Sequence, residues 1–177
     1  MKRKLLTATL LTLFALGTAA AQGCCTPTLT PPVRSSQGSP NDVSGALNTQ
    51  VSLTYGKTLT LDAYRGQPLI LAVFSTTCPS CVKELKALAK LQAVGTKVLL
   101  ISGQDTLPDL VRFARTQRLP FAVGRVDSQF VSQLRVLAYP TVLILDADGR
   151  TVKRQQGTVD VQNLRGTLAG LRPTKAR

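Results

Sequence analysis

The sequence lacks two residue types on which many active sites depend. The chain of 177 residues contains no His and no Trp, and aromatic residues make up only 5% of it. Without His there can be no Ser-His-Asp triad, no Cys-His protease pair and no zinc site with an imidazole ligand. Four Cys and nine acidic residues are present. The chemistry that remains is therefore that of cysteine and carboxylate groups.

Basic residues strongly outnumber acidic ones and give a formal net charge of +13. An excess of this size can indicate nucleic-acid binding. However, the only basic cluster is Lys2, Arg3 and Lys4, and few aromatic side chains are available to stack on bases. We therefore expect no nucleic-acid partner, and we interpret the charge as a solvated basic surface that is attracted to anionic lipid.

The first 21 residues have the pattern of an export signal. The basic segment Met1–Lys4 precedes the uncharged run Leu5–Ala21, which ends in three alanines that suit signal peptidase. An uncleaved membrane anchor is the alternative, because the run is at the lower limit for a membrane span. The sequence thus predicts an exported protein in the periplasm or on the outer face of the cell envelope, with a membrane tether as one option.

Two adjacent cysteines, Cys24 and Cys25, follow this segment. Ala21-Gln22-Gly23-Cys24 is similar to the lipobox of bacterial lipoproteins, which makes Cys24 a candidate lipidation site. Gln22 fits that motif poorly, so a cleaved signal followed by two surface cysteines is the alternative. Residues 22–50 are rich in Pro, Ser, Thr, Gly and Asn, and we interpret them as a disordered linker.

From residue 51 the pattern becomes that of a folded domain. Alternating or continuous apolar segments predict strands at Val51–Tyr55, Thr58–Leu61, Pro68–Phe74, Val98–Ile101, Thr141–Leu145 and Thr151–Gln155. Helical spacing predicts helices at Cys81–Val94, at Leu107–Arg118 with Leu110, Val111 and Phe113 inward, and at Val161–Leu171. The order β-β-β-α-β-α-(short helix)-β-β-α predicts an α/β fold with a hairpin at each end.

The motif Cys78-Pro79-Ser80-Cys81 stands where a buried strand gives way to a helix. If Cys78 is the helix N-cap, Pro79 takes the first helical position, where its missing N–H costs nothing. The free amides of the first turn, including that of Cys81, and the helix dipole then favour a thiolate at Cys78. Its pKa should fall from about 8.5 into the range of roughly 3.5–7.5. We expect Cys78 to attack and the more buried Cys81 to resolve the mixed disulfide.

Two structural readings of the same motif remain open, a zinc site and an inert disulfide. Zinc would need two further ligands, and Cys24 and Cys25 could supply them only from the far side of the linker. An exported chain does permit an inert disulfide. We expect neither a metal nor another cofactor. A cis bond at Pro140, just before the strand Thr141–Leu145, would leave the strand edge open beside the cysteines.

Three motifs in the right order resemble those of the TlpA/ResA-type thioredoxin-like proteins, which are exported, often membrane-tethered thiol–disulfide oxidoreductases of bacteria. The matching segments are 56–69, 74–84 and 139–150, and the resemblance covers about residues 50–172. It implies a thioredoxin-like domain over residues 51–177, with three α/β/α layers and an N-terminal hairpin. It also implies a strand–helix insertion before the cis-proline, which would account for Gln104–Val126.

The resemblance assigns roles to residues around the cysteines. Pro140 would be the cis-proline, and the backbone of Tyr139 would pair with an extended client segment. Pro79 and Thr77 would complete the substrate-binding surface. Thr77 stands where the family usually has Trp, which removes a flat hydrophobic rim. Lys86 also departs from the family, since a kinking Pro is often found there.

Glu84 is the only Glu in the chain, and the family often has Glu at this position close to the cysteine pair. A partly buried carboxylate could exchange a proton with Cys81, which makes Glu84 a candidate catalytic residue. An ordinary first-turn Glu that is favoured by the helix dipole is the alternative. Ala72 stands where thioredoxin itself keeps a buried Asp, which the TlpA/ResA-type proteins usually lack too.

The resemblance implies that the protein exchanges disulfides with protein clients outside the cytoplasm, in the reducing direction, as in cytochrome c maturation or copper-site assembly. Electrons would come from a membrane thiol donor. The uncharged Pro79-Ser80 pair also favours a reductant. A peroxiredoxin-like thiol peroxidase is one alternative, because Thr76 and Thr77 precede the reactive Cys. A non-catalytic exported binding domain with a structural disulfide, or with a copper(I) site, is the other.

Overall fold

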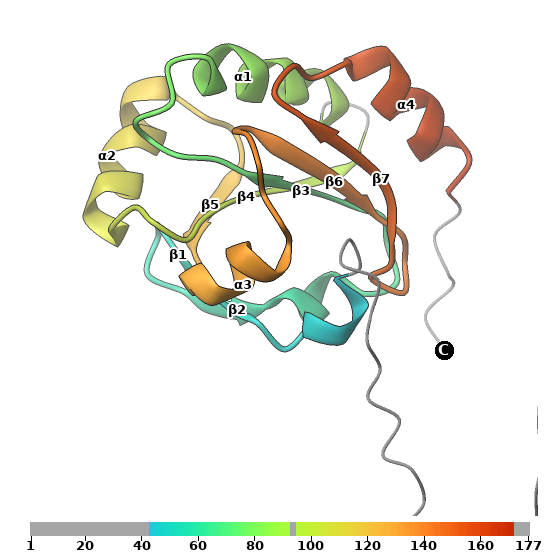
Figure 1. Cartoon of the computed structure of the whole chain (residues 1–177), viewed down its shortest axis with the longest axis horizontal. Coiled ribbons are helices and arrows are strands. Elements are labelled where there is room, and N and C mark those ends of the chain that lie inside the picture. The colour runs from blue at the N-terminus through green and yellow to red at the C-terminus, as the bar shows by residue number, and fades with distance from the viewer. Residues whose placement is uncertain (1–42, 93–94, 172–177) are drawn as a thin grey trace, which may run out of the picture. The chain divides into compact units, whose positions relative to one another are not determined.

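A seven-stranded mixed sheet is the centre of the folded domain (Figure 1). The structure is a computed structural model that describes residues 43–92 and 95–171. The strands are β1 (Gln50–Leu53), β2 (Thr58–Thr60), β3 (Leu69–Val73), β4 (Lys97–Ser102), β5 (Ala122–Arg125), β6 (Thr141–Leu145) and β7 (Thr151–Gln156). Their order across the sheet is β2-β1-β5-β4-β3-β6-β7. The three central strands β5, β4 and β3 run parallel, and the outer pairs are antiparallel.

Helices cover both faces of this sheet. The helices α1 (Cys81–Gln92), α2 (Leu107–Gln117) and α4 (Val161–Ala169) supply buried side chains to one apolar cluster. The short helix α3 (Ser128–Gln133) and the 3-10 turns Ser44–Ala46 and Leu61–Tyr64 lie on the other face (Figure 1). The predicted three-layer α/β/α arrangement is therefore confirmed.

The central strand β3 divides the core between the two layers. All five of its residues are buried, as its continuous apolar run predicts. Successive side chains point to opposite faces of the sheet. Ile70 and Ala72 pack with Leu85 of α1, whereas Leu71 and Val73 belong to the cluster on the face of α3. The chain leaves β3 at residue 73, and a short loop of residues 74–77 leads from there to the cysteine motif, so this buried strand fixes where the motif begins.

Both predicted hairpins are present. β1 and β2 pair with Gly56 in a left-handed conformation at the turn, and β6 and β7 are joined through Asp148 and Gly149. The helix α2 ends at Gln117 because Arg118 adopts a left-handed conformation, one residue earlier than predicted. The helix α4 ends at Ala169, short of the predicted Leu171. The last two residues predicted for the first helix, 93 and 94, lie outside the described residues.

The element order that the sequence pattern predicts lacks one strand. β5 lies between α2 and α3 and pairs with both β4 and β1. It falls within Gln104–Val126, where the family resemblance implies an insertion, and α2 and β5 together fill that stretch. The strand has only four residues and contains Gly124, which weakens the strand signal in its sequence.

The linker prediction, residues 22–50, is too long at its C-terminal end. Val43 and Leu47 are 0% and 5% exposed and belong to the core, and the chain enters β1 at Gln50. A segment that is mostly polar still supplies two apolar side chains to the sheet face, so composition alone misplaced the boundary.

The other N-terminal predictions cannot be compared with the structure. The signal or anchor segment 1–21, Cys24 and the linker up to residue 42 lie outside the described residues. Among residues 43–92 and 95–171, no helix combines the length and apolar character that crossing a membrane requires.

The junction of β1 and β5 provides a test of core packing. A Cβ atom at Gly124 would lie 2.4 Å from Cγ1 of Val51 and 3.1 Å from the carbonyl oxygen of Ser52. We expect Gly124→Ala to lower the free energy of unfolding by about 1–3 kcal/mol, because the strands must move apart. In the control Gly166→Ala, a Cβ atom meets nothing within 4 Å in helix α4, and stability should rise by up to about 1 kcal/mol. Urea denaturation checks both values, and equal midpoints for the two variants would contradict the packing argument.

Candidate active site

Cys78 and Cys81 are joined by a disulfide at the junction of β3 and α1. Their Cα atoms are 5.4 Å apart, and the two residues differ in exposure. Cys81 is 0% exposed and packs with the α1 side chains of the core, whereas Cys78 is half-buried at the surface. An incoming thiol or disulfide can therefore reach Cys78 more readily than Cys81.

The start of helix α1 differs from the sequence prediction. The helix begins at Cys81, and the N–H of Glu84 donates to the carbonyl oxygen of Ser80 at 3.3 Å. The N–H of Cys81 donates to the carbonyl oxygen of Cys78 at 3.2 Å. Cys78 is therefore not the N-cap, and the Cys81 amide is used in a tight turn instead of pointing freely to the Cys78 sulfur. This four-residue turn across the motif takes the place of the first α-helical turn.

The hydroxyl group of Ser80 lies beside the reactive sulfur. Its Oγ atom is 3.5 Å from Sγ of Cys78. In the reduced protein this hydroxyl can donate a hydrogen bond to the Cys78 thiolate, and such a bond favours the ionised form. The sequence prediction overlooked this contact, although Ser80 was the one side chain within the motif that could donate.

The predicted cis-proline faces the cysteines. The Tyr139-Pro140 bond is cis, and Pro140 is buried at the start of β6. The Tyr139 carbonyl oxygen lies 3.7 Å from Sγ of Cys78. Thr77 and Pro79 are exposed on the cysteine side of this contact. The structure thus places these four predicted residues around Cys78, with the backbone of Tyr139 next to the sulfur.

An arginine that the sequence prediction did not consider holds the loop in front of Pro140. From β7, Arg154 donates to the carbonyl oxygens of Leu134 and Arg135, each at 2.6 Å. These carbonyl groups end helix α3, where Arg135 adopts a left-handed conformation. Partial burial lowers the pKa of Arg154 from its ordinary value, but an arginine remains charged at neutral pH. The guanidinium group therefore fixes the start of the cis-proline loop.

The carboxylate of Glu84 lies one turn into helix α1 and is half-buried. Its Oε2 atom accepts a hydrogen bond of 2.8 Å from the N–H of Val159, in the loop between β7 and α4. Glu84 therefore connects the helix of the cysteines to the C-terminal helix. This anchoring contact is a structural role that the sequence prediction did not include.

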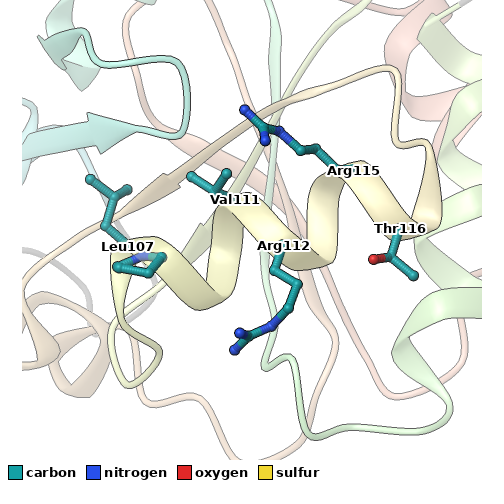
Figure 2. A pocket seen from close by; sticks show the side chains of 6 residues that line it. Leu107, Val111, Arg112, Arg115 and Thr116 are labelled. Carbon is teal, nitrogen blue, oxygen red and sulfur yellow. The ribbon is translucent and has the colours of Figure 1, made fainter.

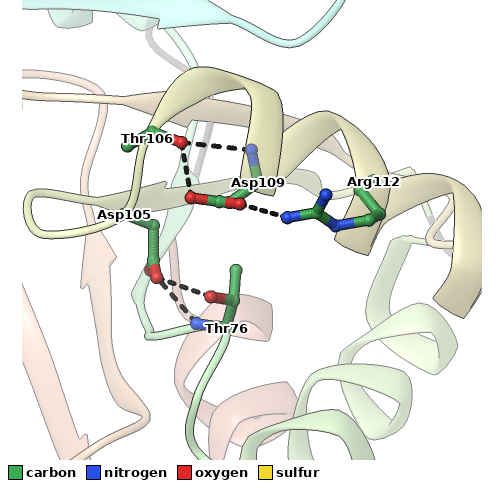
Figure 3. A network of polar contacts seen from close by, with 5 residues as sticks. All are labelled: Thr76, Asp105, Thr106, Asp109 and Arg112. Atoms are coloured by element: carbon green, nitrogen blue, oxygen red, sulfur yellow. Dashed lines mark hydrogen bonds and ion pairs between the residues drawn. The ribbon is translucent and has the colours of Figure 1, made fainter.

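The loop between β3 and the cysteine motif is held by several hydrogen bonds. The N–H of Cys78 donates to the carbonyl oxygen of Ser75 at 3.2 Å, and Oγ of Ser75 lies 2.9 Å from Oγ1 of Thr77. Thr76 donates through both its N–H and its hydroxyl group to the carboxylate of Asp105 (Figure 3). The chain therefore reaches Cys78 through a fixed turn.

A surface hollow lies along α2, away from the cysteines. It measures about 530 Å³ and is lined by Leu107, Pro108, Val111, Arg112, Arg115 and Thr116 (Figure 2). Val111 is therefore only half-buried and borders this surface hollow, in contrast to its predicted inward position. Within the described parts of the chain, no group of three or more Cys, Asp or Glu residues could hold a metal ion.

Comparison with known proteins gives relatives named as thiol–disulfide oxidoreductases, and the solved structures with a similar fold include a peroxiredoxin of Xanthomonas campestris, with a TM-score of 0.56 at 19% identity, covering 71% of this chain and 90% of that chain. The "Thiol:disulfide interchange protein DsbE" of Vibrio cholerae is 28% identical over 118 residues, which cover 66% of this chain and 64% of that protein. The "Thiol-disulfide oxidoreductase ResA" of Geobacillus thermodenitrificans is 25% identical over 124 residues, 67% of this chain and 71% of that protein. A solved secreted disulfide oxidoreductase of Mycobacterium tuberculosis aligns with a TM-score of 0.60 at 18% identity, covering 71% of this chain and 97% of that chain.

These comparisons define the fold and the family. The structural likeness supports the thioredoxin-like fold. The chain spans only 59–64% of the length of three DsbE relatives that it matches. A family model described as the AhpC/TSA family matches residues 44–154. Because that match includes more than half of the sequence, with both cysteines and the cis-proline, the chain belongs to the AhpC/TSA family of thioredoxin-like proteins.

Proposed function

We propose that the protein is an extracytoplasmic thiol–disulfide oxidoreductase that acts on protein clients through Cys78 and Cys81. One observation carries this proposal: a half-buried cysteine sulfur lies 3.7 Å from the backbone before a cis-proline, while its disulfide partner is fully buried. An inert disulfide needs no accessible sulfur, and it gains nothing from a neighbouring open backbone segment. The similarity to proteins named DsbE and ResA supports the same activity.

In the reducing direction, the reaction begins with both cysteines reduced. The Cys78 thiolate attacks one sulfur of a client disulfide, which forms a mixed disulfide and releases the other client sulfur as a thiolate. Cys81 then loses its proton and attacks Sγ of Cys78. The Cys78–Cys81 bond forms, the second client thiolate leaves, and two electrons have passed to the client. A thiol donor must then reduce the protein again.

The client is expected to bind beside Cys78 as an extended segment. The backbone of Tyr139 would pair with it in the manner of an added strand, and the exposed Thr77 and Pro79 would contact its flanks. Leu137, in the loop before the cis-proline and two residues before Tyr139, is 86% exposed, and we expect it to make an apolar contact with the client. Since Thr77 replaces the usual Trp, we expect the client surface to be less apolar on the cysteine side.

The proposed biological setting follows from the names of the relatives and from the N-terminal sequence. Relatives named as interchange proteins and oxidoreductases support a role in reducing client cysteines, of the kind needed in cytochrome c maturation or copper-site assembly. A membrane thiol protein would supply the electrons. The basic segment and the uncharged run at the N-terminus support export, and they support a tether through the membrane or through a lipid on Cys24.

The first test traps the mixed disulfide. In Cys81→Ser, the resolving thiol is absent, so a disulfide-bonded client peptide should remain attached to Cys78. We expect mass spectrometry to find the peptide on Cys78, and we expect Cys78→Ser to abolish the adduct. The wild-type protein should release the reduced peptide and return to the Cys78–Cys81 disulfide.

Three results would contradict the proposed function. A reduction potential of the Cys78–Cys81 pair far below about −300 mV would indicate a structural bridge. Rapid consumption of hydrogen peroxide without exchange with peptide disulfides would instead indicate the peroxiredoxin-like alternative. The absence of an adduct on Cys78 in Cys81→Ser would show that Cys78 does not attack the client disulfide.

Glu84 can be tested separately as a proton carrier for Cys81. In Glu84→Gln, the side-chain carbonyl group can still accept from the N–H of Val159, but the acid–base function is lost. We expect slower resolution of the mixed disulfide, a changed pH profile between pH 5 and 9, and little change in melting temperature. Unchanged rates over this range would leave Glu84 with its anchoring role alone.

Ser80 should stabilise the Cys78 thiolate. Removal of the hydroxyl group in Ser80→Ala deletes the donor that lies 3.5 Å from Sγ. The pKa of Cys78, measured from the pH dependence of its alkylation by peptide mass spectrometry, should rise, because the ionised sulfur loses a hydrogen bond. Ser80→Thr keeps a hydroxyl group and should stay near the wild-type value. An equal rise in both variants would assign the effect to the turn and not to the hydrogen bond.

A further inference from the structure

Asp105 is a buried acidic residue outside the cysteine motif. It lies in the loop between β4 and α2, and only 8% of it is exposed. Its carboxylate accepts hydrogen bonds from three donors: the hydroxyl group of Thr76 at 2.5 Å, the N–H of Thr76 at 3.1 Å, and the hydroxyl group of Ser102 at 2.6 Å. Figure 3 shows the two bonds to Thr76 crossing from the β4–α2 loop to the loop after β3. Both carboxylate oxygens are therefore occupied.

These bonds act on a segment that leads directly to the reactive sulfur. Thr76 is two residues before Cys78 and 29 residues before Asp105, so the contact joins two distant parts of the chain. Burial of a carboxylate is unfavourable unless donors satisfy it, and hydrogen bonds to a charged acceptor are among the strongest in proteins. Both donors of Thr76 are committed to this one side chain. The backbone just before Cys78 is consequently held by a residue of the loop that follows β4.

The neighbouring residues of the same loop contact the other half of the site. The side chain of Gln104 accepts a long hydrogen bond of 3.4 Å from the hydroxyl group of Tyr139. A Cβ atom at Gly103 would lie 2.7 Å from Cγ2 of Val131 and 3.0 Å from Cα of Ser128, so the loop packs closely on helix α3. Three consecutive residues thus contact three different segments. Gly103 packs on α3, Gln104 contacts the cis-proline loop, and Asp105 binds the loop before Cys78.

The β4–α2 loop is itself held at its far end. Thr106 is the N-cap of α2, and its Oγ1 atom accepts from the backbone N–H of Asp109, a bond that does not depend on the Asp109 side chain (Figure 3). This capping arrangement fixes the first turn of α2 directly after Asp105. The ring of Phe74, at the end of β3, lies 5.2 Å from that of Phe113 on α2. The loop can therefore act as a rigid support.

We propose that the β4–α2 loop, Ser102–Thr106, sets the position of Cys78 relative to the cis-proline loop, with Asp105 as the positioning residue. This inference rests on the proposed function, because it concerns how a client disulfide is aligned between Cys78 and Tyr139. The distance of 3.7 Å between Sγ of Cys78 and the Tyr139 carbonyl oxygen depends on two separate loops. The β4–α2 loop contacts both of them through adjacent residues. Asp105 binds the loop before Cys78, and Gln104 binds Tyr139 of the cis-proline loop.

The positioning role predicts a selective loss of activity. A client peptide must contact Tyr139 and Cys78 at the same time, whereas a small aromatic disulfide needs only the sulfur. Loosening the support should therefore slow exchange with the peptide more than exchange with the small disulfide. A residue that served stability alone would leave the ratio of the two rates unchanged.

The experiment compares these two rates at Cys78 in three variants of the full chain. Asp105→Asn should slow exchange with a disulfide-bonded peptide by about tenfold or more, because misplaced reacting groups lose alignment. Thr76→Val, which lacks the hydroxyl donor, should have the same effect, and Thr76→Ser should restore the peptide rate. Exchange with the small disulfide, followed as the Cys78 adduct by mass spectrometry, should change less than about threefold in all three.

Asp109→Asn is the matched control. It removes the same charge one helical turn away, and the described contacts of Asp109 are with Thr106 and Arg112 and not with Thr76. Its peptide rate should stay within about twofold of wild type, even if its melting temperature falls as far as that of Asp105→Asn.

The outcomes separate this inference from the proposed function. If Asp105→Asn and Thr76→Val exchange peptide at the wild-type rate, or if both rates fall equally in each variant, Asp105 does not position Cys78. An equal loss of the peptide rate in Asp109→Asn would also overturn the inference. If the wild-type protein does not exchange with the peptide while Cys78 still reacts with the small disulfide, the proposed function itself fails.

Discussion

The pairing of β3 with β6 is the constraint on which the site depends. In this antiparallel pair, Val73 lies opposite Thr141, so the end of one strand is beside the start of the other. The chain that leaves β3 carries Cys78, and the chain that enters β6 carries Pro140. A shift of one residue in this register would exchange the two apolar faces of β3, so that its side chains no longer fit either of the two packed clusters. The core of the sheet therefore also brings the sulfur and the cis-proline together.

The same core explains why the two cysteines differ. Cys81 is the first residue of α1 and lies on the stripe with Leu85 and Leu88 that packs against the sheet. Cys78 precedes the helix, in a turn whose other residues are exposed. Because the apolar stripe of α1 must face the sheet, the second cysteine is covered and the first remains accessible. The difference in exposure on which the proposed order of attack and resolution rests therefore follows from ordinary amphipathic packing.

The sequence allowed the prediction of those features that depend on local pattern. The apolar run of β3, the helical spacing of α1 and the two hairpins all have short-range signals, and the paired cysteines lie within four residues. The contact of Asp105 with Thr76 has no such signal, because the two residues are far apart in the sequence and an Asp between a strand and a helix is also typical of a turn. The sequence also gives no sign that Arg154 differs from other basic residues of an edge strand. Its hydrogen bonds to the end of α3 are visible only in the folded structure. Such contacts are set by tertiary structure.

The chain uses carboxylates as anchors on both sides of the cysteine turn. Asp105 accepts from the N–H of Thr76 before Cys78, and Glu84, one turn after Cys81, accepts from the N–H of Val159. In each case a carboxylate binds a backbone amide that belongs to a different segment of the chain. Cys78 and Cys81 thus lie in a short turn between two anchored segments. In a chain without His, two acidic side chains hold the segments on either side of the cysteine pair, and the proposed exchange depends on the position that they give it.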